Sequence, residues 1–354
     1  MKHNELKSYA SGGGLLDRRL FLKRGLIFST AAVSSDLLAK TAHTSQTLPG
    51  WMLNPGDPFS NYGQPSPYEK STIRWIMGNR MAPGNGVSWT PLHNLEGIIT
   101  PSGLHFERHH NGVPRIEPNM HQLLLHGLVK NSLMFSIDSL MRYPMESCLC
   151  FIECGGNSNA GWRKNPIQTP AGYFHGMASC SEWTGVPLNI LLEEAGLKKD
   201  AGWIIAEGAD AAAIHVSIPL AKARNDCILA LYQNGERIRP ENGYPLRLIV
   251  PGWEGVVNVK WLRRLHLTDR PVMARNETSK YTDLLPSGKA RQFSFVMDAK
   301  SLITNPSFGH QMNKPGLYQI SGLAWSGRGK ISKVEVSADG GKSWAEAELQ
   351  EPVL

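Results

Sequence analysis

Short segments in which apolar and polar residues alternate are spread along the chain, and each predicts a half-buried β-strand. A helical pattern is clearest at Pro187–Ala195, where a proline opens the segment and Gly196 ends it. A second, short helix is predicted near Ser71–Met77. Strands and helices do not alternate regularly, so we predict a mixed α+β domain. Its predicted strands are 121–128, 203–206, 214–218, 246–250 and 259–267.

The last part of the chain has a different pattern. Strand-like segments 317–325 and 331–337 are followed by the turn Ser337–Gly341 and a returning segment, 343–349. They predict the start of an immunoglobulin-like β-sandwich, a fold that needs about 100 residues and seven strands. Too few residues follow Val296 for this, so we expect either a small sandwich or a truncated one. The expected domains are a leader at 1–42, the α+β domain at 43–290 and the partial sandwich at 291–354.

The excess of basic residues is concentrated near the start of the chain. Lys and Arg number 37 against 30 Asp and Glu, and most of this excess lies in residues 1–24. The remainder is close to neutral, which removes the main support for nucleic-acid binding. Asp17–Arg24 resembles a twin-arginine export signal, and the alternative is a chance Arg-Arg pair on a surface helix. The signal predicts a periplasmic protein, and no run of about 20 apolar residues predicts a membrane span.

The stretch Ser147–Asn157 holds three of the five cysteines. Cys148, Cys150 and Cys154 share a parity, so a strand here would point all three side chains to one face. The following Gly155-Gly156-Asn157 predicts a sharp turn where backbone approaches a ligand closely. Cys154 is therefore a candidate metal ligand. Cysteines are more often small buried apolar residues, and we keep that interpretation for Cys148 and Cys150.

Common cofactor and catalytic motifs are missing from the sequence. It has no Cys-x-x-Cys-His for haem, no phosphate-binding Gly-rich loop and no nucleophile elbow, and its Cys and His spacings support zinc only weakly. What is left is a set of scattered polar and cationic side chains that suit an anionic ligand such as a phosphate. Taken one at a time, each has an ordinary structural explanation. The set is Arg108, His109, His110, Arg247, Lys260 and Tyr281.

Several motifs, in order from about residue 65 to the end, resemble the sulfite oxidase family of molybdenum enzymes. Within this family the chain is most similar to the SoxC branch, the molybdenum subunits of sulfane dehydrogenases. That closer similarity rests on Glu107–His110, Trp253–Gly255 and Glu277–Leu284. The motifs of the wider family are Phe106–His110, Ile152–Asn157, Ser179–Val186, Glu207–Asp210, Ser217–Leu220, Tyr244–Gly252, Val259–Leu262, Ala324–Gly327 and Ser337–Trp344.

The resemblance implies a fold, a cofactor and a set of site residues. The fold would be an α+β molybdopterin domain followed by an immunoglobulin-like dimerisation domain. The cofactor would be molybdenum bound to molybdopterin, with Cys154 as the thiolate on the metal. Arg108 and Tyr281 would hold the substrate oxyanion, where their positive charge and hydroxyl favour developing negative charge. The residues implied to contact the molybdopterin are Phe106, Glu107, Arg108, His109, His110, Asp210, Asn242, Arg247, Asn258, Val259 and Lys260.

Departures from the family pattern bear on the substrate. The family often has His where this chain has Asn242 and Asn258, often has Asn at His109, and has an arginine near Ser158-Asn159 that is missing here. With less positive charge, free sulfite is disfavoured, and a sulfane sulfur on a carrier-protein cysteine is favoured. Without a cytochrome b5 domain, electrons would pass to a separate c-type cytochrome of the SoxD kind.

The expected function is therefore a periplasmic, molybdenum-dependent sulfane dehydrogenase subunit. It would be a homodimer or heterotetramer if the C-terminal domain is complete. Two alternatives stay open, a sulfite dehydrogenase acting on free sulfite and a non-catalytic interaction subunit. A sulfoxide reductase of the same superfamily is disfavoured by the C-terminal sandwich.

Overall fold

The computed structural model describes residues 52–53, 62, 64–69, 71–165 and 167–350 of the chain. Contacts divide the chain into two units, Met1–Gln64 and Pro65–Leu354, and the fold given below is that of the second. The expected leader at 1–42 lies outside the described residues. None of the described helices is long and apolar enough to cross a membrane.

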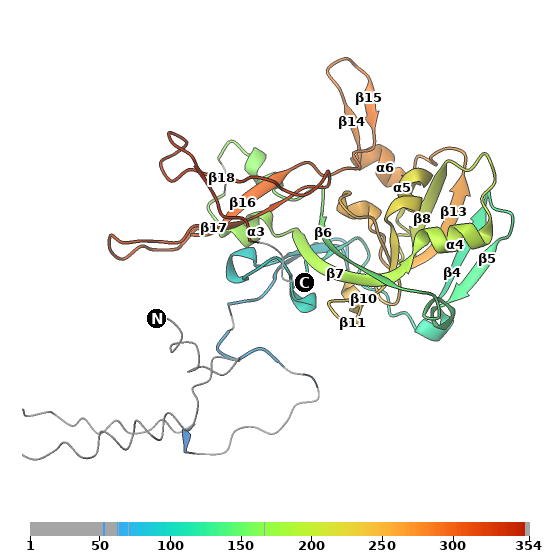
Figure 1. Cartoon of the computed structure of the whole chain (residues 1–354), viewed down its shortest axis with the longest axis horizontal. Coiled ribbons are helices and arrows are strands. Elements are labelled where there is room, and N and C mark those ends of the chain that lie inside the picture. The colour runs from blue at the N-terminus through green and yellow to red at the C-terminus, as the bar shows by residue number, and fades with distance from the viewer. Residues whose placement is uncertain (1–51, 54–61, 63, 70, 166, 351–354) are drawn as a thin grey trace, which may run out of the picture. The chain divides into compact units, whose positions relative to one another are not determined.

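The first five-stranded sheet contains strand β6, which ends at Glu153, one residue before Cys154. It has the order β11-β10-β7-β6, and β12 also pairs with β10 (Figure 1). Strand β6 pairs with β7 along its whole length, and on one face it buries Cys150 and Ile152. The strand predicted at the cysteine-rich stretch is thus confirmed. The bounds are β6 Glu146–Glu153, β7 Ala178–Pro187, β10 Ile228–Gln233, β11 Glu236–Arg237 and β12 Arg247–Ile249.

The second five-stranded sheet has the order β5-β4-β13-β8-β9, with β13 parallel to β4 and antiparallel to β8. Alternate residues of β4 and β13, among them Leu123, Leu125 and Leu265, are fully buried in the main core. Each such side chain contributes about 1.5–3 kcal/mol by leaving water. The bounds are β4 Gln122–Gly127, β5 Leu133–Ser136, β8 Trp203–Gly208, β9 His215–Pro219 and β13 Leu262–Thr268.

Short helices close this core. The predicted helix is present as α4, which buries Leu188, Leu191 and Leu192 on one face and ends at Gly196 with φ of 66°. The strands predicted at 214–218 and 246–250 are confirmed as β9 and β12. The bounds are α2 Ile137–Leu140, α3 Ala171–His175, α4 Leu188–Ala195, α5 Leu220–Asn225 and α6 Arg275–Lys280.

The helix predicted near Ser71–Met77 is wrong, because that part of the chain forms strand β1. In a three-stranded sheet, β1 pairs antiparallel with β2, and β2 pairs with β3. Trp75 lies opposite Trp89, and their rings stack with centroids 4.5 Å apart. This pairing with a distant segment outweighs the local helical tendency. The bounds are β1 Trp75–Gly78, β2 Gly86–Trp89 and β3 Arg108–His109.

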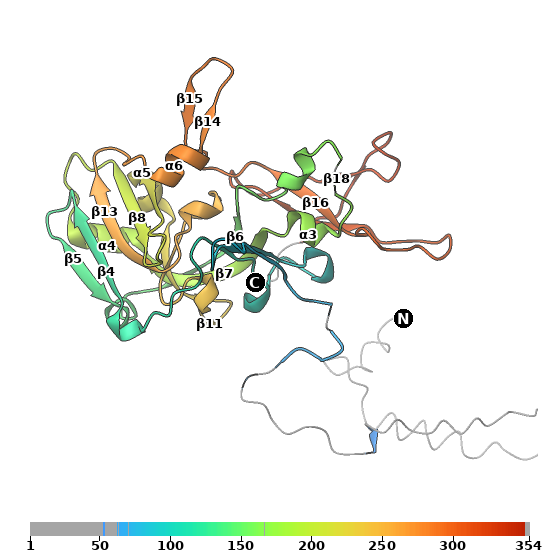
Figure 2. The same ribbon diagram turned by 180° about the vertical axis from the view of Figure 1, so that it is seen from behind.

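The C-terminal part consists, among the described residues, of paired strands as the sequence predicts. The hairpin of β14 and β15 projects away from the rest of the unit in both views, and β16 and β17 lie at the opposite end of the unit from β4 and β5 (Figures 1 and 2). The domain boundary expected near residue 290 stays a prediction. The bounds are β14 Thr282–Leu284, β15 Ala290–Gln292, β16 Lys300–Asn305, β17 Ser321–Trp325, β18 Glu335–Val336 and β19 Ala345–Glu346.

Candidate active site

Cys154 lies directly after β6, at the start of the glycine turn. Its backbone N–H donates to the Met177 carbonyl at 3.0 Å, and its own carbonyl accepts from Asn157 N–H at 2.8 Å. These two bonds fix the thiol at the end of the strand. Its side chain packs against the same hydrophobic cluster that holds Cys150 and Ile152, as the shared parity predicts.

The residue before Cys154 ties the strand end to the C-terminal strands. Glu153 is buried, and its carboxylate accepts from Lys300 Nζ at 2.6 Å and from Trp325 Nε1 at 2.7 Å. Asn157 Nδ2 donates to the same carboxylate at 2.9 Å. The turn that carries Cys154 is therefore held from both sides, which limits how far the sulfur can move.

Burial sets the protonation of the Cys154 thiol. It raises the pKa of the thiol, while the Gly156 N–H and the charge of Arg108 act in the opposite direction. A thiol in this environment is protonated near neutral pH and is a poor free nucleophile. A bound metal cation reverses this, because coordination removes the thiol proton. The site therefore suits a metal ligand better than a free catalytic thiol.

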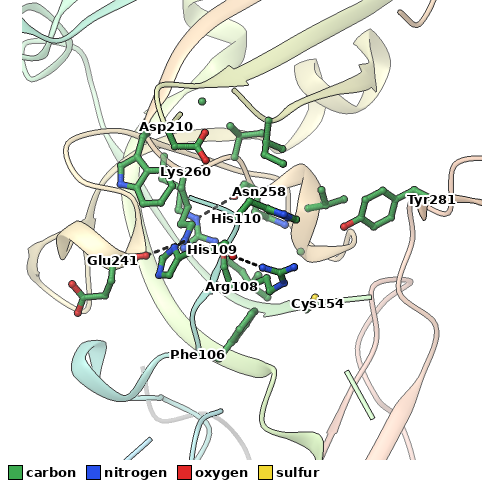
Figure 3. Close-up of a pocket in the computed structure, with 18 residues that line it drawn as sticks. Phe106, Arg108, His109, His110, Cys154, Asp210, Glu241, Asn258, Lys260 and Tyr281 are labelled. Carbon is green, nitrogen blue, oxygen red and sulfur yellow. Dashed lines mark hydrogen bonds between the residues drawn. The ribbon is translucent and has the colours of Figure 1, made fainter. Parts of the chain in front are cut away.

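A cavity of about 110 Å³ opens beside Cys154. Figure 3 shows the predicted site residues converging on it from separate elements of the chain. Eleven of the predicted residues line it, whereas Glu107 and Asn242 lie behind its wall. The eleven are Phe106, Arg108, His109, His110, Cys154, Asp210, Arg247, Asn258, Val259, Lys260 and Tyr281.

One end of the cavity is built around Lys260. Its Nζ lies 2.8 Å from His109 Nδ1 and donates to the carbonyls of Arg108 at 3.3 Å and Glu241 at 3.1 Å. It also lies 4.4 Å from the centroid of the Trp261 ring. Burial, then repulsion from Arg247, lowers the pKa of Lys260 well below its ordinary value. The amine is thus held by neutral acceptors.

His109 lies between Lys260 and the carboxylate of Glu107 and contacts both. Its Nε2 lies 2.5 Å from Glu107 Oε2, and Arg74 pairs with the other oxygen of Glu107. Because Nδ1 accepts from Lys260, the proton of the neutral ring belongs on Nε2, facing Glu107. Burial lowers the pKa of His109, so the ring is neutral near pH 7. Glu107 therefore orients His109 and does not itself line the cavity.

Arg247 is a second buried cation at the wall. Its Nη1 donates to the Asn242 carbonyl at 2.8 Å, its Nε donates to the Asn258 carbonyl at 3.3 Å, and its guanidinium lies 5.0 Å from the Trp183 ring centroid. Burial lowers the pKa of Arg247 to about 9. Asn242 thus acts through its backbone, while its side chain donates to Ser102 O and Gln233 Oε1, both at 2.9 Å.

The opposite end holds Arg108, Tyr281 and Cys154. In Figure 3 the Tyr281 hydroxyl points into the cavity on the side of Arg108, His110 and Cys154, with Lys260 and His109 lying farther from it. Burial, then the Cys154 sulfur, raises the pKa of the Tyr281 phenol, so the hydroxyl keeps its proton and can donate it in a hydrogen bond. Tyr281 follows α6 directly, and α6 is anchored by the buried Glu277, whose carboxylate accepts from Ala274 N–H at 2.8 Å.

The two cations at the wall lack carboxylate partners. Among the described residues, neither Lys260 nor Arg247 forms an ion pair, and Arg108 does not either. Buried charges are costly unless they are paired. A bound phosphate would supply the missing negative charge, so the residues fit a phosphorylated cofactor.

Cys154 is the one cysteine among the described residues that line the cavity. No group of three or more His, Cys, Asp or Glu side chains gathers in the part of the chain that the structure describes. A single thiolate does not hold a metal alone, so further donors from a bound cofactor would complete the coordination. This, too, fits a cofactor that carries its own sulfur ligands.

Seven residues that line the cavity were missed from the sequence. They are mostly small or apolar, and apolar residues in a strand or turn carry no signal of ligand binding. Two of them, Glu241 and Trp261, are direct neighbours of the predicted residues Asn242 and Lys260, which is the one clue the sequence offers. The seven are Ile152, Gly208, Ile214, Glu241, Gly255, Val256 and Trp261.

The two five-stranded sheets, the thiol of Cys154 at a strand end, the cavity with its buried cations and the paired C-terminal strands together define a molybdopterin-dependent oxidoreductase. The oxidoreductase molybdopterin binding domain family matches residues 110–276, and the Mo-co oxidoreductase dimerisation domain family matches 291–353. The chain belongs to the sulfite oxidase family of these enzymes. In detail it is similar to the crystal structure of the sulfane dehydrogenase SoxCD from Paracoccus pantotrophus, with 42% identity and a TM-score of 0.83 over 88% of this chain and 80% of that one.

Curated relatives cover more than one activity. Mouse mitochondrial sulfite oxidase is 31% identical over 84% of this chain and 58% of its own length. The NADH nitrate reductase of Ulva prolifera is 29% identical over 71% of this chain and 32% of its own length. The chain thus spans about half or less of these relatives, which differ in the reaction named for them.

Proposed function

We propose that this chain is the molybdenum subunit of a periplasmic sulfane dehydrogenase that oxidises sulfur bound to a cysteine of a carrier protein. The observation that carries the proposal is the placement of Cys154, Arg108 and Tyr281 at one end of a cavity whose other end holds unpaired cations. The similarity to SoxCD supports the choice of substrate.

Two asparagines, Asn258 in the cavity lining and Asn242 behind its wall, favour a substrate other than free sulfite. Where relatives often have histidines, the side chain of Asn242 bonds to Ser102 and Gln233, and that of Asn258 accepts from Val250 N–H at 2.8 Å. Neither residue adds a positive charge. Arg108 is left to balance a bound anion at this end, which suits a sulfur atom with little charge better than a dianion.

Each residue then has a distinct task. When bound, the molybdenum cofactor supplies the two-electron redox chemistry, in which a water adds one oxygen atom to sulfur and two protons and two electrons leave. Lys260, Arg247 and the neutral His109 hold the cofactor through its phosphate end. The Tyr281 hydroxyl and the Arg108 guanidinium orient the substrate and stabilise negative charge as it develops on oxygen.

The electron acceptor and the oligomeric state are inferred from the family. The two electrons would leave one at a time to a c-type cytochrome of the SoxD kind, which the similarity to SoxCD supports. The match to a dimerisation domain supports a homodimer, or a heterotetramer with the cytochrome. Periplasmic location rests on the leader at 1–42, which precedes the described residues.

Metal analysis joined to paired assays tests the proposal. Protein from a host that makes the cofactor should contain close to one molybdenum per chain, and it should reduce cytochrome c with carrier-bound sulfane far faster than with sulfite. Cys154→Ser should lose this activity, whereas Cys180→Ser, which alters a thiol outside the cavity, should retain it. Protein without molybdenum would contradict the proposal.

Sulfite dehydrogenase is the second candidate function. It is favoured by the similarity to sulfite oxidases and by the retained Arg108 and Tyr281. Faster cytochrome c reduction with free sulfite than with carrier-bound sulfane would select it. A purely structural role is disfavoured, because the predicted residues converge on one cavity with their cations unpaired.

A further inference from the structure

A second, larger cavity of about 530 Å³ adjoins the first. His110 and Ile214 line both cavities, so the two are neighbours in the fold. The proposed reaction uses the first cavity only. A sulfur-containing anion of a few atoms would leave most of the second unfilled, so its size points to a larger ligand.

The lining of the second cavity suits a polypeptide backbone. One side is formed by Ala211 and Ala212, whose small side chains let another chain approach closely. No described residue accepts a hydrogen bond from the backbone N–H of Ala211 or Ala212. The lining also includes the amides of Asn85 and Asn276, which both donate and accept. Peptide groups need this mixture of donors and acceptors.

Charge argues in the same direction. Among the described residues that line the second cavity, Arg275 is the one with a permanent charge, and His215 is one of its two histidines. His110 also lines it, and burial, then Arg108, lowers the pKa of His110, so that ring is neutral near pH 7. A small dianion would be weakly held by such a surface, whereas a neutral extended backbone needs no counter-charge.

The second cavity is connected to the reacting end by two elements. Arg108 Nη1 donates to Asn85 Oδ1 at 3.4 Å, so the proposed oxyanion-binding guanidinium contacts a residue that lines the larger cavity. Helix α6 begins at Arg275 in the lining and leads directly to Tyr281 in the first cavity. A chain lying along α6 would thus reach both residues that hold the reacting sulfur.

We propose that this second cavity binds an extended segment of the carrier protein next to its sulfur-bearing cysteine, so that peptide contacts help to place the sulfur beside Arg108 and Tyr281. The inference rests on the proposed function and specifies how its substrate is recognised. Ala211 and Ala212 lie in the turn that Ala213 N–H closes on the Asp210 carbonyl at 2.9 Å, and their own backbone N–H groups would donate to carbonyl groups of the bound segment.

Binding of a defined probe tests the inference without turnover. The probe is a short alanine-based peptide whose central cysteine carries an S-methylthio group, compared with the same S-methylthio-cysteine as a capped single amino acid. Isothermal titration calorimetry on the molybdenum-loaded protein should show the peptide binding at least about tenfold more tightly. Equal affinities would overturn the inference.

Variants locate the effect. Ala211→Trp, which places a large side chain in the cavity, should bind the peptide and the capped amino acid with about equal affinity. The matched Ala345→Trp, at an exposed position of β19, should keep it. Thermal unfolding and molybdenum content of both variants confirm that they are folded and loaded. An unchanged advantage in Ala211→Trp would place the peptide elsewhere and contradict the inference.

The two proposals fail in different ways. If the loaded protein oxidises carrier-bound sulfane but binds peptide and capped amino acid equally, the function stands and the second cavity has no such role. If the protein lacks molybdenum or oxidises no sulfane, the proposed function fails, whatever the peptide does.

Discussion

The carboxyl group of Glu254 occupies the space that a side chain at Gly155 would need. A Cβ added to Gly155 would overlap Glu254 Oε1, and one added to Gly255 would lie 2.7 Å from the Glu153 carbonyl. The turn after Cys154 and the turn that begins at Glu254 therefore fit together only because both have glycine at their contact.

Gly155→Ala should disturb this contact and the thiol beside it. Because the Cβ must displace Glu254 or the turn, we expect a loss of about 1–3 kcal/mol in stability and most of the bound molybdenum. Gly78→Ala is the control, since nothing lies within 4 Å of a Cβ there. Metal analysis and chemical denaturation would measure both effects, and a Gly155→Ala protein with full molybdenum would contradict this account.

Glu254 should also make stability depend on pH. Burial, then Asp283 and Glu153, raises the pKa of this carboxyl to about 7, and its Oε2 has no hydrogen-bond partner among the described residues. The folded state therefore holds a proton that the unfolded chain releases near its ordinary pKa. The unfolded state binds fewer protons in this range, so stability falls as pH rises from about 4.5 to about 7.

Glu254→Gln should remove that fall. Relative to the variant, the cofactor-free wild-type protein should lose up to about 3 kcal/mol between these pH values. Denaturation at several pH values measures the difference, and Glu182→Gln at an exposed position of β7 is the control. If the stability of wild type and of Glu254→Gln changed with pH in the same way, the pKa of the Glu254 carboxyl would not be raised in the folded protein.

Tyr281→Phe removes a hydroxyl that points into the reacting end of the cavity. If this group stabilises developing negative charge, kcat/KM should fall by about a hundredfold while molybdenum content stays unchanged. Tyr143→Phe is a suitable control, because Tyr143 donates to Glu194 at 2.5 Å and does not line the cavity. Steady-state kinetics with both variants decides the matter. An undiminished kcat/KM would exclude a catalytic hydroxyl.

Lys260→Met should separate cofactor binding from folding. The amine is bonded to neutral acceptors, so its loss relieves a buried charge and should stabilise the cofactor-free protein by about 1 kcal/mol. The cofactor would lose its contact with the Lys260 amine. Its binding free energy would weaken by about 3 kcal/mol or more, which is on the order of a hundredfold in affinity. Lys198→Met, at an exposed position, should change neither quantity. Normal cofactor retention in Lys260→Met would refute the role given to this amine.

Local pattern was enough for part of the fold. The alternation in β6 placed Cys150, Ile152 and Cys154 on one face, because strand geometry fixes side-chain direction every second residue. The helix Leu188–Ala195 was also predictable, since proline and glycine mark its two ends. The resemblance of ordered motifs named the site residues, of which eleven share one cavity.

The amino-acid sequence by itself determined the strand periodicity, the glycine turn after Cys154 and the family. Only the tertiary structure decided that Lys260 meets His109, 151 residues away, that Glu254 fills the space at Gly155, and that the chain near Trp75 forms a strand. The physical reason is that these outcomes depend on pairing and burial between distant segments. Local propensity is a matter of neighbouring residues, and it carries no information about which distant partner excludes water from a charge or completes a sheet.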